Sequence, residues 1–240
     1  MPTANDIATA PAGNQLIDHL PGPVARTLLA GCRPLQLTFN QDVAQAGAPV
    51  LRVLFPTTAI LSLTLRVSGH RPLGMGMIGH EGMLGATLAL GVSRHPRQAI
   101  VQGAGTALEI TAVNFERQLS QSAALKHCIH GYLFVLAEQL AQAAACNAFH
   151  DVTSRLANWL LMMDDRARGK SLTLTHQFLS NMLGVRRSAV TIAAGQLQRK
   201  KMIRYSRGHI QVLSRSGLES VACECYSEAL AAYRREFSPG

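Results

Sequence analysis

The sequence predicts an α+β protein made of an N-terminal antiparallel β-roll, one long helix, and a C-terminal pair of short helices followed by a β-hairpin. Three observations predict this fold class: glycine-separated apolar stretches between Gly31 and Gly105, a proline-free helical pattern, and two apolar-periodic runs joined at Gly184. At roughly 100 to 200 residues per domain, the chain has room for about two domains. We expect a β-roll with flanking helices at residues 1–121, the long helix at 122–150 and the C-terminal part at 151–240.

The β-roll is predicted by eleven glycines between Gly31 and Gly105. Between them, segments such as SLTLRV and TALEI have the composition of half-buried strands, at a spacing typical of an antiparallel sandwich or roll. Short helices are expected on both sides, and Asn114 is expected to cap the one that follows.

The long helix carries apolar residues three and four positions apart. This face predicts either the seam of a parallel homodimer or a surface that packs on the chain's own β-roll, and the pattern alone leaves both open. The residues assigned to the dimer seam are Leu125, Ile129, Tyr132, Leu133, Leu136 and Leu140.

The cysteines do not predict a metal site. The chain has five of them, an odd number, without a CxxC pair and without a histidine at zinc-ligand spacing. Cys223 and Cys225 lie two positions apart on an expected helix, so their thiols should point to different faces. We therefore predict buried or incidental thiols and no bound metal.

Membrane and enzyme classes lack support in the sequence. No window approaches the roughly 18 to 20 apolar residues of a membrane-spanning helix, and the N-terminus lacks a basic cluster before an apolar run. We expect a soluble cytoplasmic protein without a membrane partner. Without a nucleophile elbow, a phosphate-cradling loop or a metal-ligand cluster, no enzymatic activity is expected.

Positive charge is concentrated in the C-terminal part. Residues 151–240 hold fourteen Lys/Arg and seven Asp/Glu, and residues 170–215 hold nine Lys/Arg and no acid. Such a block of one sign attracts a polyanion, which predicts double-stranded DNA as the partner. The alternative is a ligand-binding regulatory module that does not bind DNA specifically.

The two short helical runs fit a helix-turn-helix. Thr175 can cap the first helix, Leu179 and Leu183 lie one turn apart, and Gly184 permits a sharp turn. In this motif the second helix enters the major groove with its N-terminal residues at the base edges.

The polar face of the second helix supplies the candidate DNA-binding residues. Arg187, Ser188 and Thr191 point away from the apolar stripe, where an arginine can bind the O6 and N7 atoms of guanine. We expect the remaining candidates, at the helix starts and in the hairpin turn, to contact phosphate or the minor groove; they are Arg186, His176, Gln177 and Arg207. The hairpin, formed by MIRY and HIQVL, completes a winged helix.

The order of these parts resembles the Crp/Fnr family of bacterial transcription regulators. The resemblance is carried by VLFPTTAILSLTL, by GMIGHEGMLGATLALGVSRHPRQAIVQGAGTALEI, and by the helix-turn-helix with RYSRGHIQVL. It implies a homodimer joined through the long helix, a two-fold symmetric DNA site and a contact with RNA polymerase. The family's base-reading arginine falls on Arg187, and Ser188 stands where a glutamate often follows.

The resemblance also locates an effector pocket, whose key residues differ here. Gly85 matches the family's glycine, but Ala86 replaces the glutamate that binds the ribose hydroxyl of a cyclic nucleotide. Arg97 matches the phosphate-binding arginine, but Gln98 replaces the hydroxyl residue beside it. Tight cyclic AMP binding is therefore not expected, because a lost hydroxyl acceptor costs about 1 to 3 kcal/mol. An iron–sulfur cluster is not expected either, since no cysteine precedes Gly31, and the effector stays unknown.

Overall fold

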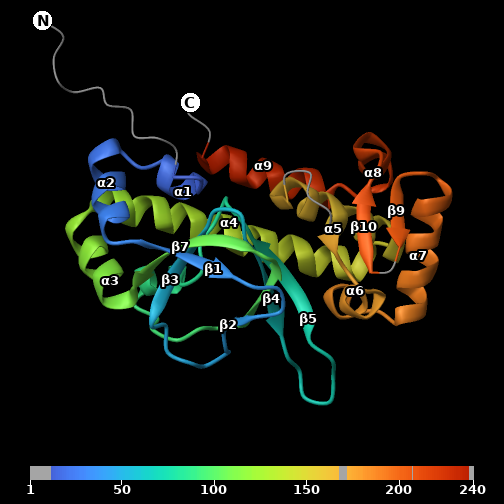
Figure 1. The fold of residues 1–240 in the computed structure, drawn as a ribbon, viewed down its shortest axis with the longest axis horizontal. Coiled ribbons are helices and arrows are strands. Elements are labelled where there is room, and N and C mark those ends of the chain that lie inside the picture. The colour runs from blue at the N-terminus through green and yellow to red at the C-terminus, as the bar shows by residue number, and fades with distance from the viewer. Residues whose placement is uncertain (1–11, 168–171, 207, 238–240) are drawn as a thin grey trace, which may run out of the picture.

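The computed structural model describes residues 12–167, 172–206 and 208–237, with only the backbone described at 172 and 173. In this part of the chain a β-roll is followed by one long helix and a mainly helical C-terminal region (Figure 1). Every strand pairing is antiparallel. The predicted fold class is confirmed.

Two sheets form the roll. One has the strand order β1 (Arg33–Leu37), β7 (Gly105–Thr111), β3 (Arg52–Pro56), and the other has the order β2 (Asp42–Ala44), β6 (Gln98–Gly103), β4 (Ile60–Leu65), β5 (Leu73–Ile78). Apolar side chains of both sheets form one buried cluster that includes Leu37, Leu54, Leu61, Ile78 and Val101. Burial of this surface is the main stabilising contribution to the roll.

Helices cover the three-stranded sheet on its outer side. They are α1 (Gln15–Asp18), α2 (Gly22–Ala30), α3 (Ala112–Gln121) and the first turns of α4 (Ala123–Phe149), and they share a second apolar cluster with Val53 and Phe55 of β3. The predicted cap at Asn114 is wrong. The helix begins two residues earlier, and the Thr111 side chain accepts a hydrogen bond from the Asn114 backbone N–H.

The apolar face of α4 packs on the β-roll of its own chain. Leu125, Ile129 and Tyr132 are at most 4% exposed, and Tyr132 Oη donates a hydrogen bond to the Met83 carbonyl. The other three predicted seam residues are partly buried on the same side: Leu133, Leu136 and Leu140. The roll covers Leu125, Ile129 and Tyr132, so these three are not available to a dimer partner, whereas a seam contact of the half-buried Leu133, Leu136 and Leu140 stays a prediction.

A different face of α4 is open to solvent. Phe134 is 58% exposed, and exposed alanines follow it at alternating steps of three and four residues. We call this set the outer stripe; it consists of Phe134, Ala137, Ala141, Ala144 and Ala148.

The C-terminal region contains the predicted helix-turn-helix and hairpin. Its elements are α5 (Val152–Ala167), β8 (Leu172–Thr173), α6 (His176–Leu183), α7 (Arg187–Arg199), β9 (Ile203–Ser206), β10 (His209–Val212), α8 (Arg215–Val221) and α9 (Cys225–Phe237). The wing sheet has the order β8-β10-β9, and Ile210 opposite Tyr205 sets its register. In Figure 1, α9 runs back along the molecule toward α1, and Phe237 joins the apolar cluster of the β-roll.

The helix-turn-helix contacts β5 of the roll closely. A Cβ atom at Gly74 would lie 2.8 Å from the Met182 carbonyl oxygen, so only glycine permits this approach. A buried ion pair between Arg166 of α5 and Glu81, with Nη2 and Oε1 2.8 Å apart, adds a second connection. Helices α5 and α6 are thus held against the roll within one chain.

The prediction that Cys223 and Cys225 diverge on one helix is wrong. Helix α9 begins at Cys225, so Cys223 lies in the junction after α8. Both thiols reach the same place, beside Cys146 and His150 at the end of α4.

Candidate nucleic-acid interface

The first helix of the interface, α6, is fixed at both ends by local sequence. The Thr175 side chain caps its start by accepting the Phe178 N–H, and Gly184 ends it in the left-handed conformation with φ 65°. Leu179 and Leu183 are buried, as their spacing predicts. The glycine turn directs the chain into α7.

Helix α7 presents one polar and one apolar face. Val190, Ala193 and Leu197 are at most 1% exposed and anchor the helix in the core. Arg187, Ser188 and Thr191 all lie on the exposed face, as predicted. This arrangement leaves a row of side chains at the N-terminal half of α7 that a DNA groove could receive.

The start of α7 is open for an anion. Arg186 is the N-cap residue and is exposed, and its side chain makes no capping hydrogen bond. The first backbone N–H groups of a helix have no partner within the helix, and the helix dipole favours negative charge there. Arg186 and these N–H groups can together bind one phosphate.

His176 connects α6, α7 and the wing. Its ring stacks on Tyr205 of β9 with centroids 4.4 Å apart. Thr191 Oγ1 donates to the Arg187 carbonyl and lies 3.0 Å from His176 Nδ1, so Nδ1 carries the proton that Thr191 accepts. This chain of hydrogen bonds fixes the first turn of α7, which carries Arg187.

These contacts bear on the expected roles of two residues. The His176 ring is half-buried and held by Tyr205 and Thr191, so it supports α7, and its predicted contact with phosphate stays a prediction. The Thr191 hydroxyl proton is committed to the Arg187 carbonyl, which leaves the hydroxyl only as an acceptor. Burial, and after it the charge of Arg187, holds the pKa of His176 below 6.5.

The remaining exposed side chains of the candidate interface are polar or basic. Gln177 is exposed, with its amide donating to Ser180 Oγ and Asn181 Oδ1. Four exposed cations extend the surface from the end of α7 into the wing: Arg199, Lys200, Lys201 and Arg204. Arg207, the predicted contact at the wing tip, lies outside the described residues. Arg215 does not contribute, because it pairs with Asp164, Asp165 and Glu219.

Two interface residues were missed from sequence. Ile192 is 62% exposed next to Thr191, although its apolar character favours a core position. Tyr205 appears in the sequence only as a strand residue, yet it supports His176. The helical spacing around Val190 and Ala193 places Ile192 on the exposed face, so the exposure of Ile192 could have been predicted from the sequence. The contact between Tyr205 and His176 could not.

Comparison with known proteins agrees with this geometry. A family model of the Crp-like helix-turn-helix domain matches residues 154–221. FixK2 from Bradyrhizobium japonicum is similar to the chain in structure, with a TM-score of 0.68, 14% identity, and 80% of this chain and 98% of that chain covered. Residues 154–221 therefore match a Crp-like helix-turn-helix domain, and the chain shares the fold of FixK2.

Two further solved structures have the same fold. The c-di-GMP responsive global regulator CLP of Xanthomonas campestris has a TM-score of 0.61 and 16% identity, with 80% of this chain and 99% of that chain covered. A CRP/FNR-family transcriptional regulator from Thermus thermophilus has a TM-score of 0.60 and 18% identity, with 79% and 98% covered. At such identities the solved structures establish only the fold. The match of residues 154–221 to the Crp-like helix-turn-helix domain is what indicates DNA binding. The Crp/Fnr class is non-enzymatic, as predicted, and no curated protein matches the chain.

The residues at the Crp/Fnr effector positions are engaged within the roll. Gly85 has φ 97° and precedes η1 (Ala86–Leu90), and Ala86 is buried in an apolar cluster. Gln98 Nε2 donates to Asp42 Oδ1 at 2.7 Å, and Arg97 is half-buried next to it.

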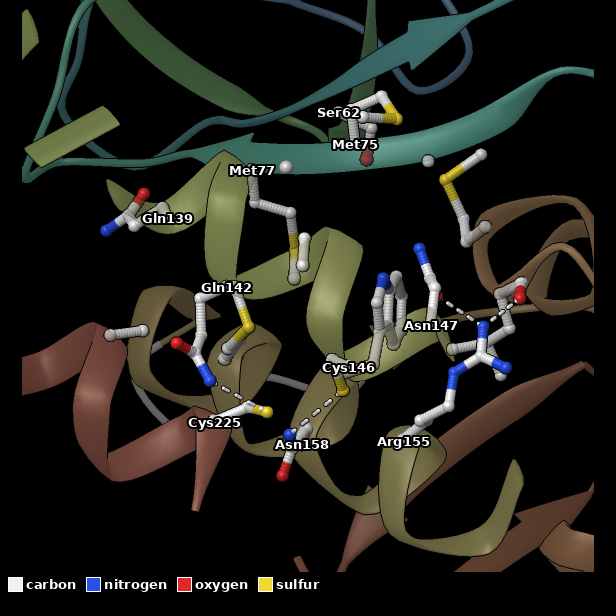
Figure 2. Close-up of a pocket in the computed structure, with 18 residues that line it drawn as sticks. Ser62, Met75, Met77, Gln139, Gln142, Cys146, Asn147, Arg155, Asn158 and Cys225 are labelled. Atoms are coloured by element: carbon white, nitrogen blue, oxygen red, sulfur yellow. Dashed lines mark hydrogen bonds between the residues drawn. The ribbon is translucent and has the colours of Figure 1, made fainter. Parts of the chain in front are cut away.

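A cavity of about 110 Å³ lies elsewhere, between the roll and the helices α4, α5 and α6 (Figure 2). None of the four effector residues lines it. Its walls are mostly apolar, with Met75, Met77 and Trp159, and one end is polar. There Arg155 donates to Asn147 Oδ1 and to the Leu183 carbonyl, as Figure 2 shows for Asn147. One guanidinium thus connects the end of α4, α5 and the end of α6.

A membrane-spanning role receives no support from the helices in the described ranges, none of which is long and apolar enough to cross a bilayer.

Proposed function

We propose that this Crp/Fnr-type regulator acts as a homodimer that reads a two-fold symmetric DNA site through Arg187. The observation that carries the proposal is the exposed start of α7. There Arg187 and Ser188 point outward, Thr191 and His176 brace the first turn, and basic residues surround them. The brace fixes the backbone from which the Arg187 side chain extends, and bidentate pairing of its guanidinium with guanine contributes to specificity.

The other exposed residues have distinct roles in this proposal. Arg186 and the α7 N-terminus hold a phosphate and set the register. Ser188 contacts a neighbouring base or phosphate, and the acceptor oxygen of Thr191 accepts from the amino group of an adenine or cytosine. Ile192 packs on a thymine methyl group, which is the apolar feature of the major groove. Gln177 approaches the phosphate backbone from α6.

The dimer forms through the outer stripe of α4. Steps of three and four residues are the repeat of a coiled coil, and alanines allow two helices to approach closely around Phe134. The Crp/Fnr resemblance implies dimerisation through this helix, and the outer stripe is an apolar face of it that is exposed to solvent. The resemblance also implies a contact with RNA polymerase, which we include in the proposal.

Cyclic AMP is not the effector in this proposal. A ribose hydroxyl would meet the methyl group of Ala86 instead of a carboxylate, and Gln98 is already bonded to Asp42. We expect 1 mM cyclic AMP to leave the thermal midpoint unchanged, and a clear rise would overturn this part of the proposal.

The DNA-reading role is tested with Arg187→Ala against Arg117→Ala, which removes an exposed arginine of α3. Fluorescence anisotropy measures binding to a selected site and to random duplex at the same salt concentration. Arg187→Ala should weaken specific binding by about 1 to 3 kcal/mol and leave nonspecific binding nearly unchanged, whereas Arg117→Ala should change neither. An unchanged preference for the selected site in Arg187→Ala would contradict Arg187 as the base reader. Equal binding of all duplexes by the native chain would instead favour a regulatory module without specific DNA binding.

A further inference from the structure

Four potential metal ligands meet at the end of α4. Their ligating atoms, the sulfurs of Cys146, Cys223 and Cys225 and a ring nitrogen of His150, all lie within 4.8 Å of one another. Cys225 is buried and the other three are half-buried. The cluster is remote in sequence from the DNA-reading residues, and none of the roles above uses it.

Two chain segments build the cluster. Cys146 and His150 are four residues apart, which places both side chains on one face at the last turn of α4. Cys223 and Cys225 flank the junction at which α8 has ended and α9 begins. Contacts between α4 and α9 hold the two segments together.

The distances match the edges of one small coordination tetrahedron. Cys146 Sγ lies 3.6 Å from Cys223 Sγ, and Cys225 Sγ lies 3.4 Å from His150 Nδ1. Zinc bond lengths give about 3.8 Å between two tetrahedral sulfur ligands and about 3.5 Å between a sulfur and a nitrogen. Iron–sulfur clusters spread their cysteine ligands over several iron atoms, so this compact set suits a single ion better.

The surroundings orient the ligands. His150 Nε2 lies 3.2 Å from Glu224 Oε1, which leaves Nδ1 directed at the sulfurs. A carboxylate on the outer nitrogen is the usual support of a metal-bound histidine. Gln142 Nε2 donates to Cys225 Sγ at 3.1 Å and Asn158 Nδ2 to Cys223 Sγ at 2.8 Å; Figure 2 shows the Gln142 contact and the longer one from Asn158 to Cys146.

The charges around the four ligands are also compatible with a bound divalent cation. A divalent cation with three thiolates and a neutral imidazole has a net charge of −1. Arg155, which is buried and interacts electrostatically with Cys146 and Cys223, carries the compensating positive charge. Balanced charge lowers the cost of burying such a site.

We propose that Cys146, His150, Cys223 and Cys225 bind one tetrahedral Zn²⁺-type cation that fastens the end of α4 to the junction before α9. All four positions are filled by protein ligands, as in structural zinc sites. The site adjoins the turn from α4 into α5, where Arg155 also connects α4, α5 and α6. Its occupancy therefore controls how firmly the DNA-binding helices are held on α4.

The metal content of the full-length chain tests the proposal. The protein is purified without a histidine tag or chelator, and metals are measured by mass spectrometry. The native chain should hold about one zinc per chain, and Cys223→Ser and His150→Asn should each lose most of it. Cys32→Ser and Cys128→Ser are the matched controls and should keep it, because these two thiols lie outside the cluster. Loss of zinc in the controls to the same extent as in the ligand variants would overturn the assignment.

Cobalt provides a readout that does not depend on a variant folding. Reduced, chelator-treated native protein should bind one Co²⁺ and show the intense visible bands of a tetrahedral ion together with a thiolate-to-metal band in the near ultraviolet. Native protein that is isolated without zinc and gives no such bands would overturn the proposal. So would stoichiometric iron with sulfide, or a Cys146–Cys223 disulfide that persists after anaerobic purification.

The role of Glu224 gives a finer test. Glu224→Gln should weaken zinc affinity about tenfold in a chelator competition while leaving the cobalt spectrum unchanged. Glu228→Gln, an exposed carboxylate on α9, should have no effect. Equal affinities in both variants would overturn the orientation assigned to His150.

Discussion

Gly184 and Gly195 lie on the same helical pair, yet they respond oppositely to a methyl group. Gly184 has φ 65°, and a Cβ there would lie 2.6 Å from Leu73 Cδ1. Gly195 lies inside α7, and its Cβ would lie 3.5 Å from the Arg199 side chain, which is ordinary contact. The left-handed conformation costs an alanine about 1 to 2 kcal/mol, whereas alanine is favoured over glycine within a helix.

We therefore expect Gly184→Ala to lower the free energy of unfolding by about 1 to 2 kcal/mol and Gly195→Ala to raise it by about 0.5 to 1 kcal/mol. Urea unfolding followed by circular dichroism measures both. A stabilised Gly184→Ala protein would contradict the turn geometry.

His176 makes stability depend on pH. Its pKa in the folded chain lies below the ordinary 6.5, because of burial and then of Arg187, so the unfolded chain takes up a proton first as the pH falls. The contribution of His176 is thus complete above pH 6.5 and is lost as the pH falls toward the folded-state pKa. Burial lowers the pKa of His95 as well, so His95 also contributes a loss of stability as the pH falls.

The variant His176→Phe keeps the ring on Tyr205 and removes the titrating group. We expect it to lose less stability than the native chain between pH 7.5 and about pH 5.5, measured by urea unfolding. His70→Phe, at an exposed loop position, should follow the native pH dependence. A His176→Phe chain with the full native loss would show that His176 does not cause it.

At the scale of elements, the outer stripe of α4 makes the clearest prediction. Phe134→Glu places a charge at the proposed helix contact, where two copies would repel, so the dimer should dissociate. Because Phe134 is exposed within one chain, the secondary structure should remain. Analytical ultracentrifugation measures the mass, with Val113→Glu on α3 as the control at another exposed apolar residue. A Phe134→Glu protein that remains dimeric at micromolar concentration would place the contact elsewhere.

Local signals in the sequence predicted the elements well. Thr175, Leu179 and Gly184 act within one short segment, so the helix-turn-helix could be located from spacing alone. The partner of the long helix could not be predicted, because spacing shows that a helix face is apolar, not which partner covers it. Residues such as Leu125 are covered by the roll, while the alanines of the outer stripe are too weakly apolar to predict a contact face.

The proposed metal-ligand cluster could not be predicted from the sequence for a related reason. Cys146 and Cys223 are 77 positions apart, so a search for local ligand motifs does not connect them. The exact start of α9 also decides whether Cys223 and Cys225 converge, and helix ends are difficult to predict from sequence. Tertiary packing of α9 on α4 supplies the missing information.

At the scale of the whole molecule, the roll, α5 and α6 form one packed frame that carries α7 and the outer stripe. The roll contacts α6 through Gly74 and Met182, and the Arg166–Glu81 pair ties α5 to the roll. Two chains joined along α4 would present two α7 helices related by a two-fold axis. Such pairs read half-sites about one turn of DNA apart, roughly 34 Å.

The most direct test of this account is selection of binding sites from a random DNA library by the native full-length chain, followed by the mass of the complex. We expect an inverted repeat with half-sites about one helical turn apart, bound by two chains per duplex. An enriched site without two-fold symmetry, bound by a single chain, would contradict the account.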